Sequence, residues 1–341
     1  MRKVKRSILG AAAMVAALGL AGPGSAQVGG VPAPQHSCQR GCLEDKVNRY
    51  LEAMAEGGFD EELFARDVRF TENGVELPLG NEGLWATTSG LGQYKFYVPD
   101  VETQQVAFLG TVLEIASSSA TGEAREPELV GLSLRLRIGE NGKITEVEQI
   151  AARAERPLGP GATAGSSPFP ATGAAVEAMG SPNPVFLQAV PESQRHTRAE
   201  LVAVSDAYFE AVERNTGKDY YPFTDDCVRY ENGIVTAGAP DDERPNRLGC
   251  RGQLETTLIG AVTGVRDRRI VAVDRERGVA FAFAFFDHRP INWSWQLGEL
   301  FKIENGQIRR IEAIFIRGPY GMCSGWSTYE QCRSEEPQDV R

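Results

Sequence analysis

The stretch FAFAFFDH, at 281–288, places two ionisable groups at the end of an apolar run. Successive side chains of an extended strand point to opposite faces, so Asp287 shares a face with phenylalanines and His288 lies on the other face. A carboxylate at the end of a phenylalanine-lined face is where burial raises a pKa toward neutrality. We therefore predict Asp287 or His288 as a proton acceptor. The alternative is that they end a strand and cap a loop.

Three other polar residues lie on faces that the pattern predicts to be buried. Tyr208 belongs to the apolar face of a predicted helix, where its phenol could donate to a developing oxyanion or simply complete the core. Arg229 and Glu231 share one face of a short strand. They would orient a polar substrate if they face a cavity and would form an ordinary surface pair if they face solvent. We predict catalytic roles for Tyr208, Glu231 and Arg229.

The candidate substrate-binding residues are partly aromatic. Trp293 and Trp295, two apart in a predicted loop, would share a face as a lid or as a platform for a sugar or an aromatic ring. Packing between two parts of the chain is the alternative. Weaker candidates are Arg268, Glu299 and Tyr320. Glu299 is the strongest of these, because it precedes apolar residues on the same face of its strand.

Several other chemistries find no motif in this sequence. It contains no nucleophile elbow, no phosphate-binding glycine loop, no His-Glu-x-x-His and no dinucleotide fingerprint in a strand–helix–strand context. With only three histidines, a His-based metal centre is not expected, and we predict neither a metal nor a cofactor. A net charge of −10 and a pI near 5.1 disfavour nucleic acid and anionic membranes as partners. A small-molecule substrate or ligand is the expected partner.

A repeated tripeptide indicates how these residues are organised. Glu-Asn-Gly occurs four times, at 72–74, 140–142, 231–233 and 304–306. Around it, segments match in the same order: 49–57 with 207–215, 64–76 with 223–235, and 142–150 with 306–314. We predict one module written twice, each copy a domain. Matching 106–114 with 279–287 places Glu114 opposite Asp287, so the first copy would keep an acid and lack the imidazole. If only one copy is active, the second is expected to be the active one.

Each copy is expected to contain a helix, a short strand with Glu-Asn-Gly, a second helix and a long antiparallel meander. In the second copy Thr197, with Glu200 three residues later, predicts a capping box at the start of the first helix. The second helix is expected around GQLETTLIGAVTG, at 252–264. Strands are expected over 268–274 and 279–288, followed by a hairpin that turns at 304–306. Helices followed by a meander predict an α+β fold.

With these elements in this order, both copies resemble the SnoaL-like branch of the nuclear transport factor 2-like superfamily. The second copy is also similar to secreted fungal and bacterial proteins of unknown function that share ENG, RDRR, FFDH and PYGMxSGW, here at 231–233, 266–269, 285–288 and 319–326. The resemblance implies two cone-shaped domains, each a curved antiparallel sheet wrapped around helices. It also implies an intramolecular pseudo-dimer. Such cones bind a small apolar molecule or perform acid–base chemistry without a cofactor.

The N-terminus and the cysteines indicate an extracytoplasmic protein. Residues 1–26 combine a basic start, a short apolar core and small residues before Gln27, as in a signal peptide. Six cysteines follow, which suggests disulfides in an oxidising compartment. Many pairings are possible, and loop lengths favour Cys38–Cys42, Cys227–Cys250 and Cys323–Cys332. We expect a secreted or periplasmic protein.

The predicted organisation is a signal peptide over 1–26, a first SnoaL-like domain over 27–153, a Pro/Gly/Ala-rich linker over 154–196, a second SnoaL-like domain over 197–332 and a charged tail over 333–341. The leading functional hypothesis is a secreted lyase (dehydratase) or isomerase that uses acid–base chemistry on a small carbohydrate-like or aromatic substrate. The alternatives are a non-catalytic small-molecule binding protein and an interaction module whose cavities are filled.

Overall fold

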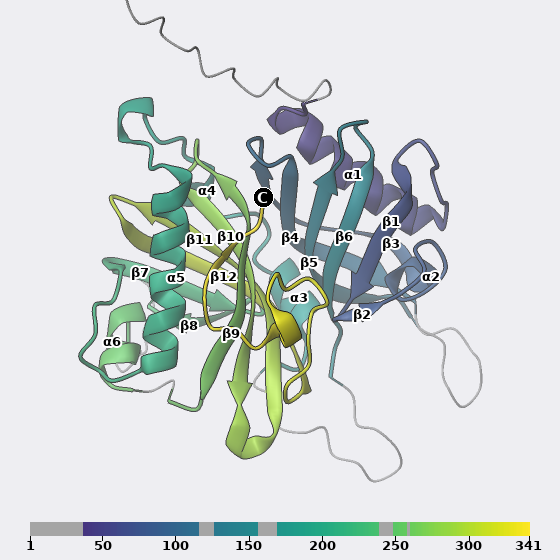
Figure 1. Cartoon of the computed structure of the whole chain (residues 1–341). Coiled ribbons are helices and arrows are strands. Elements are labelled where there is room, and N and C mark those ends of the chain that lie inside the picture. Colours follow the sequence, from purple (N-terminus) through teal and green to yellow (C-terminus); the bar gives the residue numbers. More distant parts are fainter. Residues whose placement is uncertain (1–36, 116–125, 156–168, 239–247, 258–259) are drawn as a thin grey trace, which may run out of the picture. The chain divides into compact units, whose positions relative to one another are not determined.

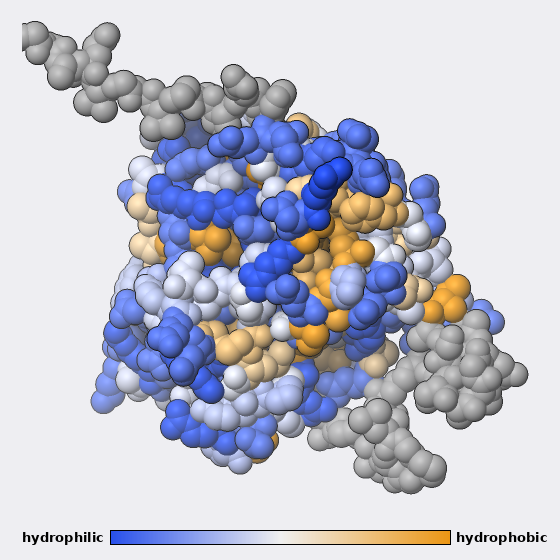
Figure 2. Space-filling view, turned by 45° about the vertical axis from the view of Figure 1, so that its right-hand side comes forward, coloured by the Kyte–Doolittle hydropathy of each residue, from blue (hydrophilic) through white to orange (hydrophobic). Residues whose placement is uncertain are grey.

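The computed structural model describes residues 37–115, 126–155, 169–238, 248–257 and 260–341. The predicted signal peptide lies outside the described residues. The described residues form one compact unit. The face seen in Figure 2 is mainly hydrophilic, with smaller hydrophobic areas. Within the described residues no helix is long and apolar enough to cross a membrane.

The first half of the unit is a six-stranded sheet with one long helix. Its strands are β1 (Phe64–Glu72), β2 (Val75–Glu76), β3 (Thr88–Asp100), β4 (Gln105–Glu114), β5 (Glu128–Ile138) and β6 (Ile144–Ala152), in the order β2-β1-β6-β5-β4-β3. Helix α1 (Arg40–Glu56) packs on one face (Figure 1). A single turn of helix, α2 (Leu84–Thr87), precedes β3.

The second half is a seven-stranded sheet with an equivalent helix. Its strands are β7 (Phe223–Glu231), β8 (Ile234–Ala237), β9 (Gly264–Asp274), β10 (Val279–His288), β11 (Trp293–Glu304), β12 (Gln307–Pro319) and β13 (Gln338–Asp339), in the order β13-β9-β10-β11-β12-β7-β8. Helix α5 (Arg198–Arg214) lies along one face (Figure 1) and begins with the predicted capping box of Thr197 and Glu200. Helix α6 (Cys250–Glu255) follows β8.

The two sheets share one strand order. Leaving β13 aside, β8-β7-β12-β11-β10-β9 in the second sheet corresponds element by element to β2-β1-β6-β5-β4-β3 in the first. The predicted hairpin is confirmed, with Glu304-Asn305-Gly306 linking β11 and β12. This shared order lets positions in one half be matched to positions in the other by strand register.

The predicted fold class is wrong. The chain is mostly strand, and both sheets are mixed, because β1 pairs in parallel with β6 and β7 with β12. Each sheet is open, with edge strands at both ends of its order, so the sheets do not close into cones around helices. The helix expected over 252–264 is α6, which ends at Glu255. The following Thr256 and Thr257 are weak helix formers, and Thr257 has φ +57°.

The Glu-Asn-Gly turns before β2 and β8 have a structural role. Asn73 and Asn232 occupy the left-handed region, with φ of 53° and 49°. Each side-chain amide then spans to the neighbouring parallel strand: Asn73 Oδ1 accepts from Ala151 N at 2.8 Å, and Asn232 Oδ1 accepts from Phe315 N at 2.8 Å. Asparagine is suited to both tasks, because it tolerates positive φ and hydrogen-bonds backbone groups.

Apolar and ionic contacts join the two halves. One buried cluster combines Phe96 of β3 and Leu109 of β4 with Phe281 and Phe283 of β10. Part of the predicted linker belongs to the same cluster, since α3 (Thr172–Glu177) and α4 (Pro184–Leu187) contribute Val176 and Phe186. Residues 156–168 of that linker lie outside the described part of the chain.

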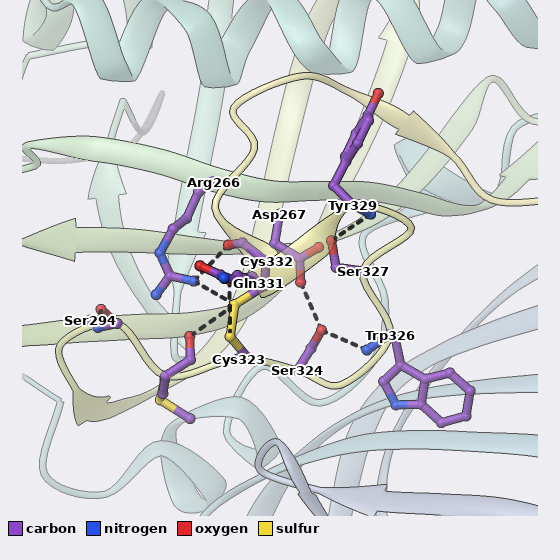
Figure 3. The surroundings of a disulfide bond; sticks show 12 residues. Arg266, Asp267, Ser294, Cys323, Ser324, Trp326, Ser327, Tyr329, Gln331 and Cys332 are labelled. Atoms are coloured by element: carbon purple, nitrogen blue, oxygen red, sulfur yellow. Dashed lines mark hydrogen bonds between the residues drawn. A yellow bond between two sulfur atoms is a disulfide. The ribbon is translucent and has the colours of Figure 1, made fainter.

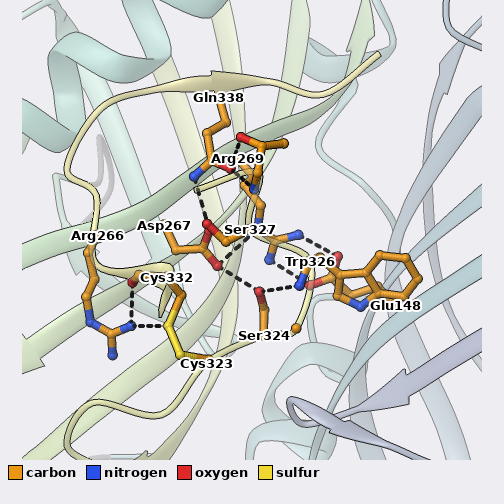
Figure 4. A network of polar contacts seen from close by, with 12 residues as sticks. Glu148, Arg266, Asp267, Arg269, Cys323, Ser324, Trp326, Ser327, Cys332 and Gln338 are labelled. Carbon is orange, nitrogen blue, oxygen red and sulfur yellow. Dashed lines mark hydrogen bonds and ion pairs between the residues drawn. A yellow bond between two sulfur atoms is a disulfide. The ribbon is translucent and has the colours of Figure 1, made fainter. Parts of the chain in front are cut away.

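The end of the chain is also packed. The predicted tail, 333–341, contains β13, which pairs with β9. Figure 4 shows the polar network beneath it: Asp267 accepts from Ser324 at 2.7 Å and from Gln338 at 3.1 Å. Beside it, Arg269 of β9 forms a two-pronged, fully buried ion pair with Glu148 of β6, both N–O distances being 2.7 Å. The C-terminal segment therefore covers an ionic contact between the halves.

The three disulfides that loop length favoured are confirmed: Cys38–Cys42, Cys227–Cys250 and Cys323–Cys332. The second ties β7 to α6, and the third closes the C-terminal loop (Figure 3). Three disulfides fit a secreted protein, because such bonds form and persist in oxidising compartments.

Candidate functional site

Four of the predicted site residues converge on the face of the second sheet that α5 covers. In a row across neighbouring strands, Glu231 of β7 lies beside Ala313 of β12, and Ala313 lies beside Glu299 of β11. Arg229 is on the same face of β7, two residues from Glu231. Tyr208 reaches down from α5, its ring 5.2 Å from that of Phe301. We call Tyr208, Arg229, Glu231 and Glu299 the buried polar cluster.

Glu299 is a carboxyl deep in the protein interior. Its side chain is 1% exposed, and Oε2 has no hydrogen-bond partner among the described residues. Burial, together with the negative charge of Glu231, raises the pKa of Glu299 to about 8, against the opposing effect of Arg229. At neutral pH Glu299 is therefore mainly protonated and acts as a hydrogen-bond donor.

Tyr208 presents a second donor beside Glu299. It is completely buried, and within the described part of the chain its hydroxyl has no hydrogen-bond partner. Burial raises the pKa of Tyr208 well above its usual value, and the charge of Glu299 raises it further. The phenol lies within hydrogen-bonding reach of Glu299 and Arg229, since side-chain hydrogen bonding with it contributes to the pKa shift of each, but its hydroxyl makes no hydrogen bond of good geometry with any described residue. Buried polar groups without partners are rare and call for an explanation.

Arg229 is the cation of the buried polar cluster. Its Nε donates to Oγ1 of Thr236 at 3.1 Å, and a terminal nitrogen donates to Oε1 of Gln253. It lies 3.5 Å from the carboxylate of Glu231, whose side chain is 16% exposed and connects the cluster to solvent. Sequence reasoning missed Gln253. A signal for it was present, because GQLETT at 252–257 matches GLWATT at 83–88 and so aligns this polar residue with the buried Leu84.

The equivalent place in the first sheet is a filled core. There the row reads Glu72, Gln149, Leu134 and Phe108. Tyr50 donates to Gln149 at 2.7 Å, and Gln149 donates to Glu72 at 2.9 Å. Every polar group in this row thus has a partner, and bulky side chains fill the rest.

The second sheet changes three of these four positions. By register, Ala313 stands for Gln149, Glu299 for Leu134 and Ala282 for Phe108. Replacing glutamine by Ala313 removes the side chain that would accept a hydrogen bond from the tyrosine. Ala282 is smaller than the phenylalanine of the first half, and Glu299 introduces an acid. At these positions the second half therefore has smaller side chains and buried donors without hydrogen-bond partners among the described residues, where the first half has bulky side chains and paired polar groups. Unpaired buried donors are expected where a ligand supplies the missing partner.

Asp287 faces away from this cluster. Its carboxylate forms an ion pair with Arg266, with an Nε–Oδ2 distance of 2.9 Å, and also accepts from Ser294. Arg266 in turn donates to the backbone carbonyl of Cys332 at 3.1 Å (Figure 3). The adjacent Phe286 is in the core cluster that contains Tyr208, so strand alternation points Asp287 to the other face. In the structure Asp287 anchors the C-terminal loop.

His288 is on the α5 side of β10 but beyond the buried polar cluster. Its ring lies 4.5 Å from that of Trp295, and burial lowers its pKa, so it is neutral at pH 7. By strand register, the position in the first sheet that corresponds to His288 is occupied by Glu114. The sequence match of Glu114 with Asp287 is therefore off by one residue, and such a slip exchanges the two faces.

The remaining candidates lie elsewhere. Trp293 and Trp295 begin strand β11, not a loop, and line a pocket at the junction of the halves. Arg268 forms ion pairs with Asp206, at 3.4 Å, and Glu213, which tie β9 to α5. Tyr320 is half-buried in the turn after β12. Among the described residues no group of His, Cys, Asp and Glu is arranged to hold a metal ion.

One comparison with known proteins found a family match in the second half. A family model described as "Domain of unknown function (DUF8021)" matches residues 194–315, which include all four members of the buried polar cluster. A search of curated proteins found no match. Among solved structures, a de novo designed protein with a curved β-sheet shares 17% identity over 36% of this chain and 88% of its own, with a TM-score of 0.26. An LEH-like epoxide hydrolase of M. tuberculosis shares 12% identity over 39% of this chain and 90% of its own, also with a TM-score of 0.26.

Proposed function

We propose that the second half is an acid–base enzyme, a lyase (dehydratase) or isomerase that acts on a small carbonyl compound with its own side chains. One observation carries the proposal: the Tyr208 hydroxyl and Oε2 of Glu299 are buried close together, and neither makes a hydrogen bond of good geometry within the described residues, on a face where alanines replace bulky residues. Two neutral donors in a water-poor site stabilise negative charge on a substrate oxygen far better than water does.

The chemistry follows from the protonation states. A substrate carbonyl oxygen accepts hydrogen bonds from Tyr208 and protonated Glu299, while Glu231 removes a proton from the neighbouring carbon. The electron pair of that C–H bond moves to the carbonyl oxygen, where the two donors stabilise it. Glu231 then returns the proton to a different carbon, which is isomerisation, or to a departing β-hydroxyl, which leaves as water. Arg229 keeps Glu231 oriented.

Hydrogen exchange tests this proposal across a range of candidate substrates. The protein is incubated in D₂O with a panel of β-hydroxycarbonyl compounds, sugar acids and aromatic ketones, and NMR records deuterium at the carbon next to the carbonyl. We expect Glu231→Gln to slow exchange by about 10²- to 10⁴-fold, as for loss of a general base. Tyr208→Phe should slow it by about 10²-fold or more, as for loss of an oxyanion donor.

The first half supplies the matched control. Tyr50→Phe removes the equivalent phenol from a filled core, where Tyr50 contacts Gln149 and not a substrate. Exchange should therefore continue at the wild-type rate in this variant. Exchange that survives both Glu231→Gln and Tyr208→Phe, with both variants folded by circular dichroism, would refute the assignment.

A further inference from the structure

A pocket lies at the junction of the two halves, outside the buried polar cluster. It encloses about 260 Å³ and is lined by the ends of β6, β11 and β12 together with Phe169 and Thr172 of the linker. Along β11, Trp295, Leu297 and Glu299 share one face, with Trp295 four residues before Glu299. Four residues of strand correspond to about 13 Å, so this junction pocket is a separate place on the molecule.

Equivalent positions of both halves build the junction pocket. Asn73 and Asn232 line it. Arg153, directly after β6, and Arg317, near the end of β12, line it at positions that correspond by strand register. The lining thus contains two guanidinium groups and one carboxylate, that of Glu155. Arg153 is already paired with the buried carboxylates of Glu72 and Glu114, so Arg317 is the guanidinium of this lining that remains to receive an anion.

The guanidinium of Arg317 is positioned to receive that anion. Its charged end lies over the ring of Trp293, 4.6 Å from the centroid, and one nitrogen meets Glu155 at 3.2 Å. Planar guanidinium has five donors in a fork that matches a carboxylate, so one contact with Glu155 leaves donors in reserve. Arg317 is exposed, which keeps these donors within reach of a solute.

Aromatic edges form the apolar wall. Trp295 stacks on Phe315 with centroids 4.8 Å apart, and Phe169 meets Phe315 edge to face at 5.1 Å. His288 also lies against Trp295, at 4.5 Å and tilted, so Trp295 already has Phe315 and His288 as ring neighbours. A sugar needs an open indole face on which to stack, whereas a flat aromatic ring fits between ring edges in offset or edge-to-face contact.

We propose that the junction pocket binds a single-ring aromatic carboxylate, with the ring against Trp295 and Phe315 and the carboxylate on Arg317. The volume suits one ring, because it is below the range of pockets that hold drug-sized ligands. The indole N–H of Trp293 adds a buried donor that has no partner among the described residues. This proposal does not depend on the function assigned to the buried polar cluster.

Tryptophan fluorescence gives a direct test, since two of the four tryptophans line the pocket. Benzoate and 4-hydroxybenzoate are titrated into the full chain, with benzamide as the neutral analogue, and calorimetry confirms each binding constant. We expect benzoate to bind at least about tenfold more tightly than benzamide, because a hydrogen bond between charged groups contributes that much.

Two arginine variants separate the pocket from nonspecific attraction. Arg317→Gln should weaken benzoate binding by about tenfold or more, and it should fold normally because a surface ion pair contributes little stability. Arg309→Gln, a matched change of an arginine paired with Glu304 away from the pocket, should leave binding unchanged. The proposal is overturned if benzoate does not bind, if benzamide binds equally well, or if binding persists in Arg317→Gln. Binding lost only in Tyr208→Phe would place the ligand in the buried polar cluster instead.

Discussion

Replacing Glu299 by glutamine should change how the stability of the protein depends on pH. The structure raises the pKa of Glu299 from 4.5 to about 8. Between these values the folded protein holds a proton that the unfolded chain releases, so folding is favoured at low pH and this contribution is lost as pH rises. Each pH unit in that window corresponds to about 1.4 kcal/mol. Glutamine has nearly the same shape and does not titrate.

The assay is urea unfolding of both proteins with disulfides intact. From about pH 5 to about pH 7, wild type should lose about 3 kcal/mol of unfolding free energy relative to Glu299→Gln. Glu140→Gln, a change in the exposed hairpin turn of the first half, should follow the wild-type profile. If the Glu299→Gln and wild-type curves run parallel across this range, the carboxyl is not held protonated and the reasoning fails.

Three further changes test the structure from other directions. Glu299→Leu installs the residue type that the first half has at this position. It should raise the free energy of unfolding near pH 7 by about 1–3 kcal/mol, because it replaces a buried acid by an apolar side chain, and it should abolish any activity. An unchanged melting temperature would argue against this. Glu148→Ala should cost about 3–5 kcal/mol in chemical unfolding, since it removes the two-pronged partner of buried Arg269, which among the described residues keeps only its single ion pair with Asp267, and an acid beside buried Arg135. A loss below about 1 kcal/mol would mean that the pair is solvated. The double change Cys323→Ser with Cys332→Ser removes a nine-residue cross-link and should cost about 2–3 kcal/mol, with faster amide exchange over 323–341; unaltered exchange there would show that the packed segment holds without it.

Local signals in the sequence were sufficient for several features. The capping box of Thr197 and Glu200 depends on residues three apart, and the hairpin at 304–306 depends on a turn between two β-patterned arms. Loop length favoured the correct disulfide pairs because short loops bring cysteines together easily. Helical and strand periodicity also placed Tyr208 and Glu299 on buried faces.

Long-range pairing was beyond these signals. The parallel contact of β7 with β12 joins segments far apart in sequence, and it makes the sheet mixed. The ion pair of Asp287 with Arg266 depends on the register between β9 and β10, which contains irregularities that the sequence does not reveal. Asp287 therefore looked like a buried base, although the structure gives it a cation as partner.

Recognising the importance of Glu299 also required the strand register. Only the alignment of four strands shows that alanines flank it where the first half has Gln149 and Phe108. Its sequence neighbours alone describe an acid between apolar residues, a weaker signal than the FAFAFFDH stretch. The comparison of the two halves, and not either half alone, identifies the site.

A carbon-13 NMR titration of protein labelled at the glutamate side-chain carboxyl observes the protonation of Glu299 itself. We predict one resonance that titrates near pH 8 and disappears in Glu299→Gln. If every glutamate carboxyl were already ionised by about pH 6, no protonated acid would stand beside Tyr208 and the proposed chemistry would have no donor.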